Sequence, residues 1–588
     1  MKEKCNCGHS PIIILPGINH SPTHLYNSDG TRAKDSKGHE IGGTLFFLNT
    51  DAVKEKLPKF ILTTLGTVVT QQDVGFRKTV YDLACTAFSY QKCDNNGDFV
   101  ENLKTERWNH SMKEMDDKRV GWVYRMVPMK SLVDVIGEDH TYFFTFNLVG
   151  DPMDSAKELN DYIQMVKEQT GHDKVILLPV SLGGTLLTAY MDSFGKENNY
   201  ADIDMIVNAV ACLDGTDIAG DIYERKFNIS DRYLHHEFIP DILKEVKIDP
   251  AKGYIANCLL HLLPQKSFDA IFTGAVSGAI DTIMANCPQV YAMVPSYRYE
   301  KIAEKYLSSP EKANLKKRAD RFQQARLNLN DNLIEANKNG VKVNSISGSN
   351  IGFGDIEYGF FGGVSSAKEL NTDGIINLSS TTLGATGAPV SKTLPQGYEQ
   401  KAHKEHNYIS PDNKIDVSSA LFPENTWIFL GQHHEVGNND VVLNLCKSII
   451  LGEVSSVHDN PEKYPQFNGS CHTMHLRRWR IPDGEKALED IKSGALKCSE
   501  EAKANLEKAV EVGKAIITST IADWDKAKEA KESLESALEI LGRFKKEKAP
   551  TAKEIAKAKR AEKASEFLLN TLGGGSITDK ILRRTIKR

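Results

Sequence analysis

The sequence has no long apolar segment. No apolar run in its 588 residues approaches the roughly 18 residues that are needed to cross a bilayer. The apolar run nearest the N-terminus, residues 11–15, is too short for the core of a signal peptide, and a Pro-Gly turn follows it. We therefore expect a protein without a transmembrane segment or signal peptide, located in the cytoplasm.

Strong net charge and regularly spaced cysteines are also lacking. The formal net charge is −5, so we expect no general attraction to nucleic acid or to acidic membranes. The 10 cysteines follow no repeating framework, which indicates reduced thiols. Residues 5–9 (Cys-x-Cys-x-His) and 471–475 (Cys-His-x-x-His) hold metal-ligating residue types, but neither has zinc-ribbon spacing. We therefore predict no metal site and no cofactor.

Composition divides the chain into a large N-terminal part and a helical C-terminal part. A chain of 588 residues is too long for one ordinary core. Residues 1–460 alternate strands with helices, except over residues 225–340, where only helical periodicity is present. Helices are expected there over residues 235–246, 252–263, 268–285 and 300–339. Ala, Lys and Glu dominate from residue 484 onward. We predict a main domain over residues 1–460, a linker over 461–483 and a helical domain over 484–588.

The C-terminal domain ends in a basic segment. Its main helices are expected over residues 500–541 and 552–572. Residues 543–588 contain 14 Lys or Arg against 5 Asp or Glu. A solvated helical surface is the simplest interpretation, and binding of a protein partner is the alternative.

Six segments of the main domain have the composition of buried strands. Each is a short apolar, β-branched or aromatic run. Helical periodicity between them is clearest over residues 154–169, 182–190 and 441–451. This alternation predicts an α/β fold whose mostly parallel sheet is covered by helices on both faces. The predicted strands are residues 11–15, 140–147, 174–178, 203–212, 341–348 and 425–430.

The strongest functional signal follows the third of these strands. Residues 179–184 read Pro-Val-Ser-Leu-Gly-Gly and lead into helical periodicity. A strand, a sharp turn with a serine and a helix form a nucleophile elbow, in which the serine hydroxyl stands clear of the backbone. Gly183 suits this turn because a side chain there would collide with the neighbouring strand, and Gly184 allows the helix to pack closely. An ordinary strand-to-helix turn gives the same pattern, so other residues must support a catalytic Ser181.

A serine nucleophile in such a fold needs an acid and a histidine base. They follow in the order serine, acid, histidine, each in a loop after a strand. Asp373 is the predicted acid, with Asp214 and Asp217 as alternatives after the strand over residues 203–212. The base is expected in the loop after the strand over residues 425–430, where His433 and the adjacent His434 are both candidates.

An oxyanion hole is expected from two loops. The N–H of Leu182 follows the serine directly, and the loop after the first strand supplies the second N–H at Ile18 or Asn19. His20 lies in the same loop and is expected to line the site rather than to act in catalysis.

Together these motifs resemble the lipases and acyltransferases related to lecithin:cholesterol acyltransferase, within the α/β-hydrolases. The family has Gly and His at the elbow where this chain has Pro179 and Val180. The resemblance spans roughly residues 11–451 and leaves out the C-terminal domain. The similar segments are the loop at 15–18, the aromatic strand at 144–147, the elbow at 179–184, the cap segment at 287–296, the acid motif at 373–376 and the Gln-His pair at 432–433.

The resemblance implies an α/β-hydrolase fold with a helical cap over residues 225–340. It also implies a serine esterase, lipase or O-acyltransferase that acts on lipid-like or other hydrophobic acyl esters. Ser181 would form an acyl-enzyme, His433 would take the serine proton, and Asp373 would orient the imidazole. The alternative is a non-catalytic binding or assembly protein on the same scaffold, in which the altered elbow no longer activates Ser181.

Overall fold

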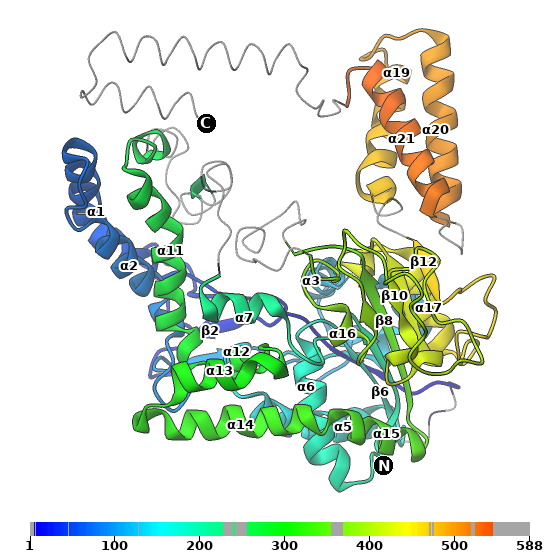
Figure 1. The fold of residues 1–588 in the computed structure, drawn as a ribbon, viewed down its shortest axis with the longest axis horizontal. Coiled ribbons are helices and arrows are strands. Elements are labelled where there is room, and N and C mark those ends of the chain that lie inside the picture. Colours follow the sequence, from blue (N-terminus) through cyan, green and yellow to red (C-terminus); the bar gives the residue numbers. More distant parts are fainter. Residues whose placement is uncertain are drawn as a thin grey trace.

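A parallel sheet of seven strands forms the centre of the computed structural model (Figure 1). The strand order is β12-β11-β8-β7-β6-β1-β5, and every neighbouring pair is parallel. The strands are β1 (Ile12–Leu15), β5 (Thr141–Phe143), β6 (Val175–Pro179), β7 (Ile203–Ala209), β8 (Lys342–Ser349), β11 (Thr426–Leu430) and β12 (Phe467–Gly469). The structure describes residues 5, 7–44, 46–127, 129–226, 234, 239–240, 256–353, 369–469, 472, 475–518 and 524–544.

The six predicted strands are all present as neighbours in this sheet. Their apolar runs are buried because helices cover both faces, as expected for parallel strands. The seventh strand, β12, was not predicted, and it lies within the segment assigned to a linker over residues 461–483. The sheet therefore extends past residue 460 before the chain leaves it.

Alternate side chains of the central strands β1 and β6 enter two separate cores. Ile12 and Ile14 pack in one core, with α4 (Lys130–Ile136) and α17 (Asp440–Ile450). Ile13 and Leu15 pack in the other. That second core is covered by α5 (Pro152–Thr170), α6 (Gly183–Tyr190), α14 (Ala313–Leu327) and α15 (Leu329–Lys338). Helices therefore cover both faces of the sheet, which is the architecture of the α/β class.

The predicted helical insertion over residues 225–340 has two different surroundings. The helix expected over 268–285 is α11 (Gln265–Thr282), but the one expected over 300–339 is three helices: α13 (Ser296–Leu307), α14 and α15. Pro310 follows α13 and cannot continue it, because its ring fixes φ and it has no N–H. Helices α14 and α15 belong to the core on the α6 face of the sheet. A helix expected over 235–246 lies outside the described residues, apart from two positions.

Helix α11 packs against α2 (Phe76–Ala87), and side chains of α1 (Thr50–Thr70), which packs on α2, join the same apolar cluster (Figure 1). The contact with α2 is close: a Cβ added at Gly278 would lie 2.5 Å from the Cβ of Ala84. Within the described residues, one helical segment, Gln265–Asn286, meets the length and composition of a membrane span, and 61% of its apolar window is buried. A core helix of a water-soluble protein satisfies the same criteria.

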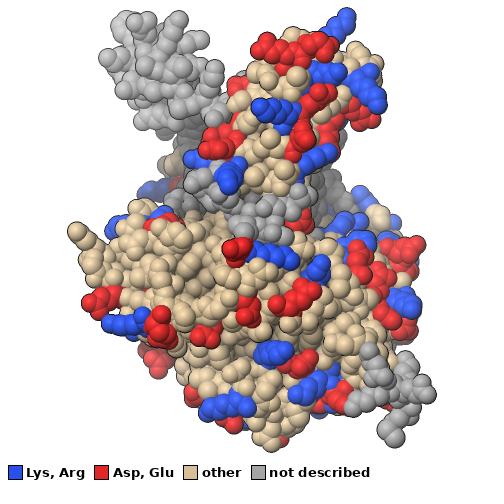
Figure 2. Space-filling model, turned by 90° about the vertical axis from the view of Figure 1, so that its right-hand side faces the viewer, with Lys and Arg blue, Asp and Glu red and all other residues tan. Residues whose placement is uncertain are grey.

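The described part of the C-terminal region is a small helical bundle. It comprises α19 (Ile481–Lys492), α20 (Glu500–Thr518) and α21 (Trp524–Ile540), so the helix expected over 500–541 is in fact two helices that pack on each other. Their core contains Leu506, Val510, Leu534 and Leu538. Acidic and basic side chains are interspersed over the bundle surface (Figure 2). The helix predicted over 552–572, and the basic segment from residue 545 onward, lie outside the described residues.

Candidate active site

Ser181 occupies a strained turn between β6 and α6. Its φ of 53° lies in the left-handed region, which costs a non-glycine residue about 1–3 kcal/mol and is typical of functional sites. The turn is held by neighbouring strands: the Val180 N–H donates to the Leu15 carbonyl (2.9 Å), and the Cys212 N–H donates to the Ser181 carbonyl (2.7 Å). The geometry is that of a nucleophile elbow, and Ser181 is 8% exposed.

Three glycines make this turn possible by close approach. A Cβ at Gly183 would lie 2.0 Å from the Leu15 carbonyl oxygen, and one at Gly184 would lie 2.6 Å from the Cys212 nitrogen. A Cβ at Gly17 would lie 2.9 Å from the Cβ of Ser181. The loop after β1 is therefore pressed against the serine, at the place expected for an oxyanion loop.

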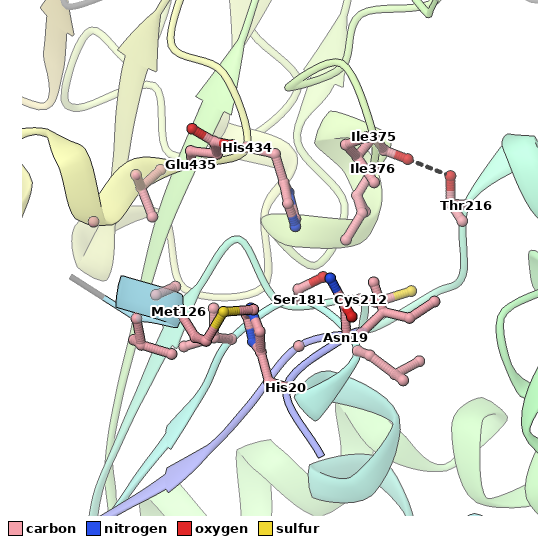
Figure 3. A pocket seen from close by; sticks show the side chains of 18 of the residues that line it. Asn19, His20, Met126, Ser181, Cys212, Thr216, Ile375, Ile376, His434 and Glu435 are labelled. Carbon is pink, nitrogen blue, oxygen red and sulfur yellow. Dashed lines mark hydrogen bonds between the residues drawn. The ribbon is translucent and has the colours of Figure 1, made fainter. Parts of the chain in front are cut away.

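The expected oxyanion donors lie on two sides of Ser181. Leu182 follows the serine, and Ile18 and Asn19 come from the loop after β1, which lies beside Ser181 in Figure 3. Within the described residues, the N–H groups of these three residues have no hydrogen-bond partner. They are free to bind a developing negative charge.

Asp373 contacts His434. Asp373 Oδ2 lies 2.8 Å from His434 Nδ1, and the His434 N–H donates to the Asp373 carbonyl (2.9 Å). Asp373 is fully buried, and its other carboxylate oxygen accepts from the N–H groups of Ile375 (2.9 Å) and Ile376 (2.8 Å). The tautomer with its proton on Nδ1 satisfies the contact with Asp373 and leaves Nε2 as an acceptor. In Figure 3 the His434 ring points toward Ser181.

His433, the base predicted from the sequence, is placed differently. It is not among the residues that line the cavity at Ser181. The structure thus brings the alternative base, His434, to Asp373. It has no hydrogen bond between Ser181 and His434, both of which it describes. Such catalytic contacts are often long without substrate.

The two alternative acids have other partners. Asp217 accepts hydrogen bonds from Arg298 (2.6 Å) and Asn377 (2.8 Å). Asp214 accepts from the Ser296 hydroxyl (3.0 Å) and N–H (3.1 Å). The structure therefore brings neither carboxylate to His434.

His20 lines the site, as the sequence predicted. Its Nδ1 is buried and has no hydrogen-bond partner in the described part of the chain. Burial and the neighbouring His434 lower the pKa of His20 to about 4. His20 is therefore neutral at neutral pH and places no second positive charge beside His434.

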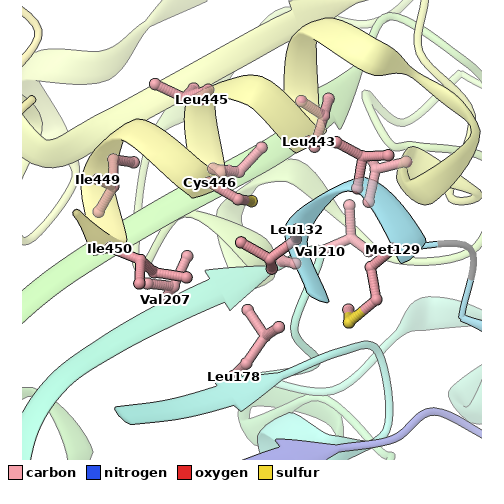
Figure 4. Close-up of a cluster of buried hydrophobic side chains, with 14 of the residues drawn as sticks. Met129, Leu132, Leu178, Val207, Val210, Leu443, Leu445, Cys446, Ile449 and Ile450 are labelled. Carbon is pink, nitrogen blue, oxygen red and sulfur yellow. The ribbon is translucent and has the colours of Figure 1, made fainter. Parts of the chain in front are cut away.

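A cavity of about 490 Å³ opens beside Ser181 and is mostly apolar. One wall comes from α4 and α17, which pack together over the sheet, with Leu132, Leu443 and Cys446 on the cavity side (Figure 4). The opposite wall comes from α7 (Asp217–Glu224) through Ile218 and Ile222. Sequence analysis missed the α4 wall. The only signal was the helical spacing of Leu132, Val133 and Ile136, which is also the pattern of an ordinary core helix.

The described part of the predicted cap contributes little to this cavity. Among the described residues of 225–340, only Met284 and Met293 line it.

No protein-family model matches the chain, and no curated protein matches its sequence. The seven-stranded parallel sheet with helices on both faces is that of the α/β class. The likeness to enzymes related to lecithin:cholesterol acyltransferase rests on the sequence motifs alone.

Proposed function

We propose that this protein is a serine carboxylic ester hydrolase or O-acyltransferase on an α/β-hydrolase scaffold. The observation that carries the proposal is the contact between buried Asp373 and His434, whose ring points toward Ser181 at a strained strand-to-helix turn. These residues come from loops after three different strands, β6, β8 and β11, in the chain order serine, acid, histidine.

The proposed reaction has two halves. The Ser181 hydroxyl attacks the ester carbonyl carbon while His434 Nε2 takes its proton, and Asp373 stabilises the imidazolium that forms. The N–H groups of Leu182 and of Ile18 or Asn19 bind the oxyanion of the tetrahedral intermediate. The C–O bond to the alcohol then breaks, His434 protonates the leaving oxygen, and an acyl-enzyme remains. Water or an acceptor alcohol repeats these steps and releases the acid or a new ester.

The cavity supports a hydrophobic acyl group as the substrate. Side chains such as Met129, Leu132, Ile222 and Leu443 offer no hydrogen bonds, so they gain free energy from an apolar chain and none from a polar one. Ser181 and His434 both line this cavity and would meet the ester, and the other polar lining residues include Asn19, His20, Arg125, Thr216 and Glu435.

Labelling with a fluorophosphonate probe tests the proposal. Only a serine with a working base and oxyanion hole reacts quickly, so we expect one adduct, on the peptide that contains Ser181. Ser181→Ala should abolish the adduct and the turnover of p-nitrophenyl esters. Ser193→Ala, in the short helical segment Met191–Gly195 that continues α6, is the matched control and should change neither. A folded wild-type protein that takes no label at Ser181 would refute the proposal and favour the non-catalytic scaffold.

A further inference from the structure

Four metal-ligating side chains converge near the N-terminus, far from Ser181 in the sheet. They are Cys5, Cys7, His140 and His172, and their ligand atoms all lie within 4.8 Å of one another. Cys5 Sγ lies 3.5 Å from His140 Nε2, and Cys7 Sγ lies 3.5 Å from His172 Nε2. We propose that these four residues form a tetrahedral zinc site.

The distances match that geometry. Zinc binds thiolate sulfur at about 2.3 Å and imidazole nitrogen at about 2.0–2.1 Å, so a tetrahedral site separates sulfur from nitrogen by roughly 3.6 Å. Both sulfur–nitrogen pairs in the structure are close to this value. Two separate thiol–imidazole hydrogen bonds would explain each pair but not the convergence of all four atoms. Two thiolates and two neutral imidazoles also balance the charge of one divalent zinc ion.

An outer partner orients one of the histidines. Asp139 Oδ1 lies 3.1 Å from His140 Nδ1, on the opposite side of the ring from the Nε2 that faces Cys5. A carboxylate on the far nitrogen of a histidine ligand fixes its tautomer and raises its basicity, and metal sites commonly have one. His9 is nearby, with Nδ1 3.9 Å from Cys7 Sγ, but it is not one of the four converging residues.

The position of the cluster indicates a structural role. His140 directly precedes β5, His172 closely precedes β6, and Cys7 lies five positions before β1. These three strands are parallel neighbours, so their amino ends meet at one edge of the sheet. Ser181 follows the carboxyl end of β6. A metal here would tie the N-terminal segment to the sheet without touching the catalytic residues, and four protein ligands would leave no position open for substrate.

Metal content and cobalt spectra of the full-length protein test the site. Purified under reducing conditions, the wild type should bind about one zinc ion per chain, and Co²⁺ should give the visible bands of tetrahedral cobalt with a thiolate charge-transfer band. The double variant Cys5→Ser/Cys7→Ser should lose the charge-transfer band and fall below about 0.1 zinc per chain. His9→Ala and Cys258→Ser are the matched controls and should keep both signals. Circular dichroism checks the fold of every variant.

A second measurement needs only wild-type protein. Zinc should protect Cys5 and Cys7 from alkylation by iodoacetamide, whereas the exposed Cys258 should react with or without zinc. The proposal is overturned if the reduced wild type binds no zinc, if the double variant binds as much as the wild type, or if zinc leaves the alkylation of Cys5 and Cys7 unchanged. Loss of the metal in His9→Ala but not in His172→Gln would overturn the proposed ligand set.

Discussion

The two adjacent histidines after β11 differ in their surroundings. His434 contacts Asp373 through both its ring and its N–H, whereas His433 does not line the cavity at Ser181. We therefore expect His434→Ala to slow phosphonylation of Ser181 by at least about 100-fold, since a general base contributes roughly 10²–10⁴ in rate. His433→Ala, the matched control, should change the rate by less than about threefold.

Asp373→Asn should give an intermediate rate, because the amide favours the wrong imidazole tautomer. The measurement is the pseudo-first-order rate of probe labelling, with circular dichroism to check folding. Equal slowing by the two histidine substitutions would contradict the assignment of His434 as the base.

The choice between these histidines could not have been made from the sequence. The spacing after the strand suits either residue, and the family motif favoured His433. The outcome depends on the turn at Gly431, which has a φ of 70°, and on the hydrogen bond from the His434 N–H to Asp373. The proposed zinc site could not be predicted from the sequence either. The motif at residues 5–9 supplies two ligands, but their partners lie 135 and 165 positions away.

His20 should make stability depend on pH. Burial, and then the charge of His434, lower its folded-state pKa to about 4, below its unfolded value of about 6.5. Between these pH values the unfolded chain binds a proton that the folded protein does not. The contribution of His20 to the free energy of unfolding is therefore complete above about pH 6.5 and is lost as the pH falls toward 4.

We expect this loss to be about 2 kcal/mol between about pH 7 and pH 5. Over the same pH interval, the free energy of unfolding of His20→Gln, measured with urea, should fall by about 2 kcal/mol less than that of the wild type. His39→Gln, an exposed control, should follow the wild type. Parallel stability curves for His20→Gln and the wild type would contradict the prediction.

At the scale of elements, burial explains which strands were predictable. Five of the six predicted strands are mainly apolar or aromatic because helices cover both faces of the sheet at those positions, whereas β8 also buries Asn344, Ser345 and Ser347. Strand β12, Phe-Asn-Gly, lies at the edge of the sheet and has no such run. Helix breaks were harder to locate. Residues 296–338 are divided into three helices at Pro310, whose fixed φ and missing N–H stop α13, and at Asn328, which is followed directly by α15.

Helices α4 and α17 should set the acyl-chain preference of the proposed enzyme. Leu443 on α17 faces the cavity, so Leu443→Phe would shorten the space for an apolar chain. We expect the ratio of kcat/KM for long-chain to short-chain p-nitrophenyl esters to fall by about tenfold, a barrier change near 1.4 kcal/mol. Leu451→Phe, at the exposed end of the same helix, should leave the ratio unchanged. An unchanged ratio in Leu443→Phe would place the acyl chain elsewhere.

At the scale of the whole molecule, the sheet separates two proposed sites. The cluster of cysteine and histidine side chains lies before the amino ends of β5, β1 and β6. Ser181, Asp373 and His434 all follow carboxyl ends, the edge at which parallel α/β sheets place their ligands. Loss of metal and loss of esterase activity should therefore be separable in variants.

The C-terminal bundle should be dispensable for chemistry. Its core is built from its own residues, and the proposed catalytic residues all precede β12. A chain that ends at residue 470 keeps the whole sheet, and we expect Ser181 to be labelled within about tenfold of the wild-type rate.

A chain that ends at residue 483 is the matched comparison. It cuts α19 after its first turn and leaves Leu476 and Ile481 without their bundle partners, so it should aggregate more readily at the same labelling rate per folded molecule. Light scattering and probe labelling measure the two effects. If the chain ending at residue 470 is folded by circular dichroism but takes no label, the bundle is part of the active site and not a separate unit.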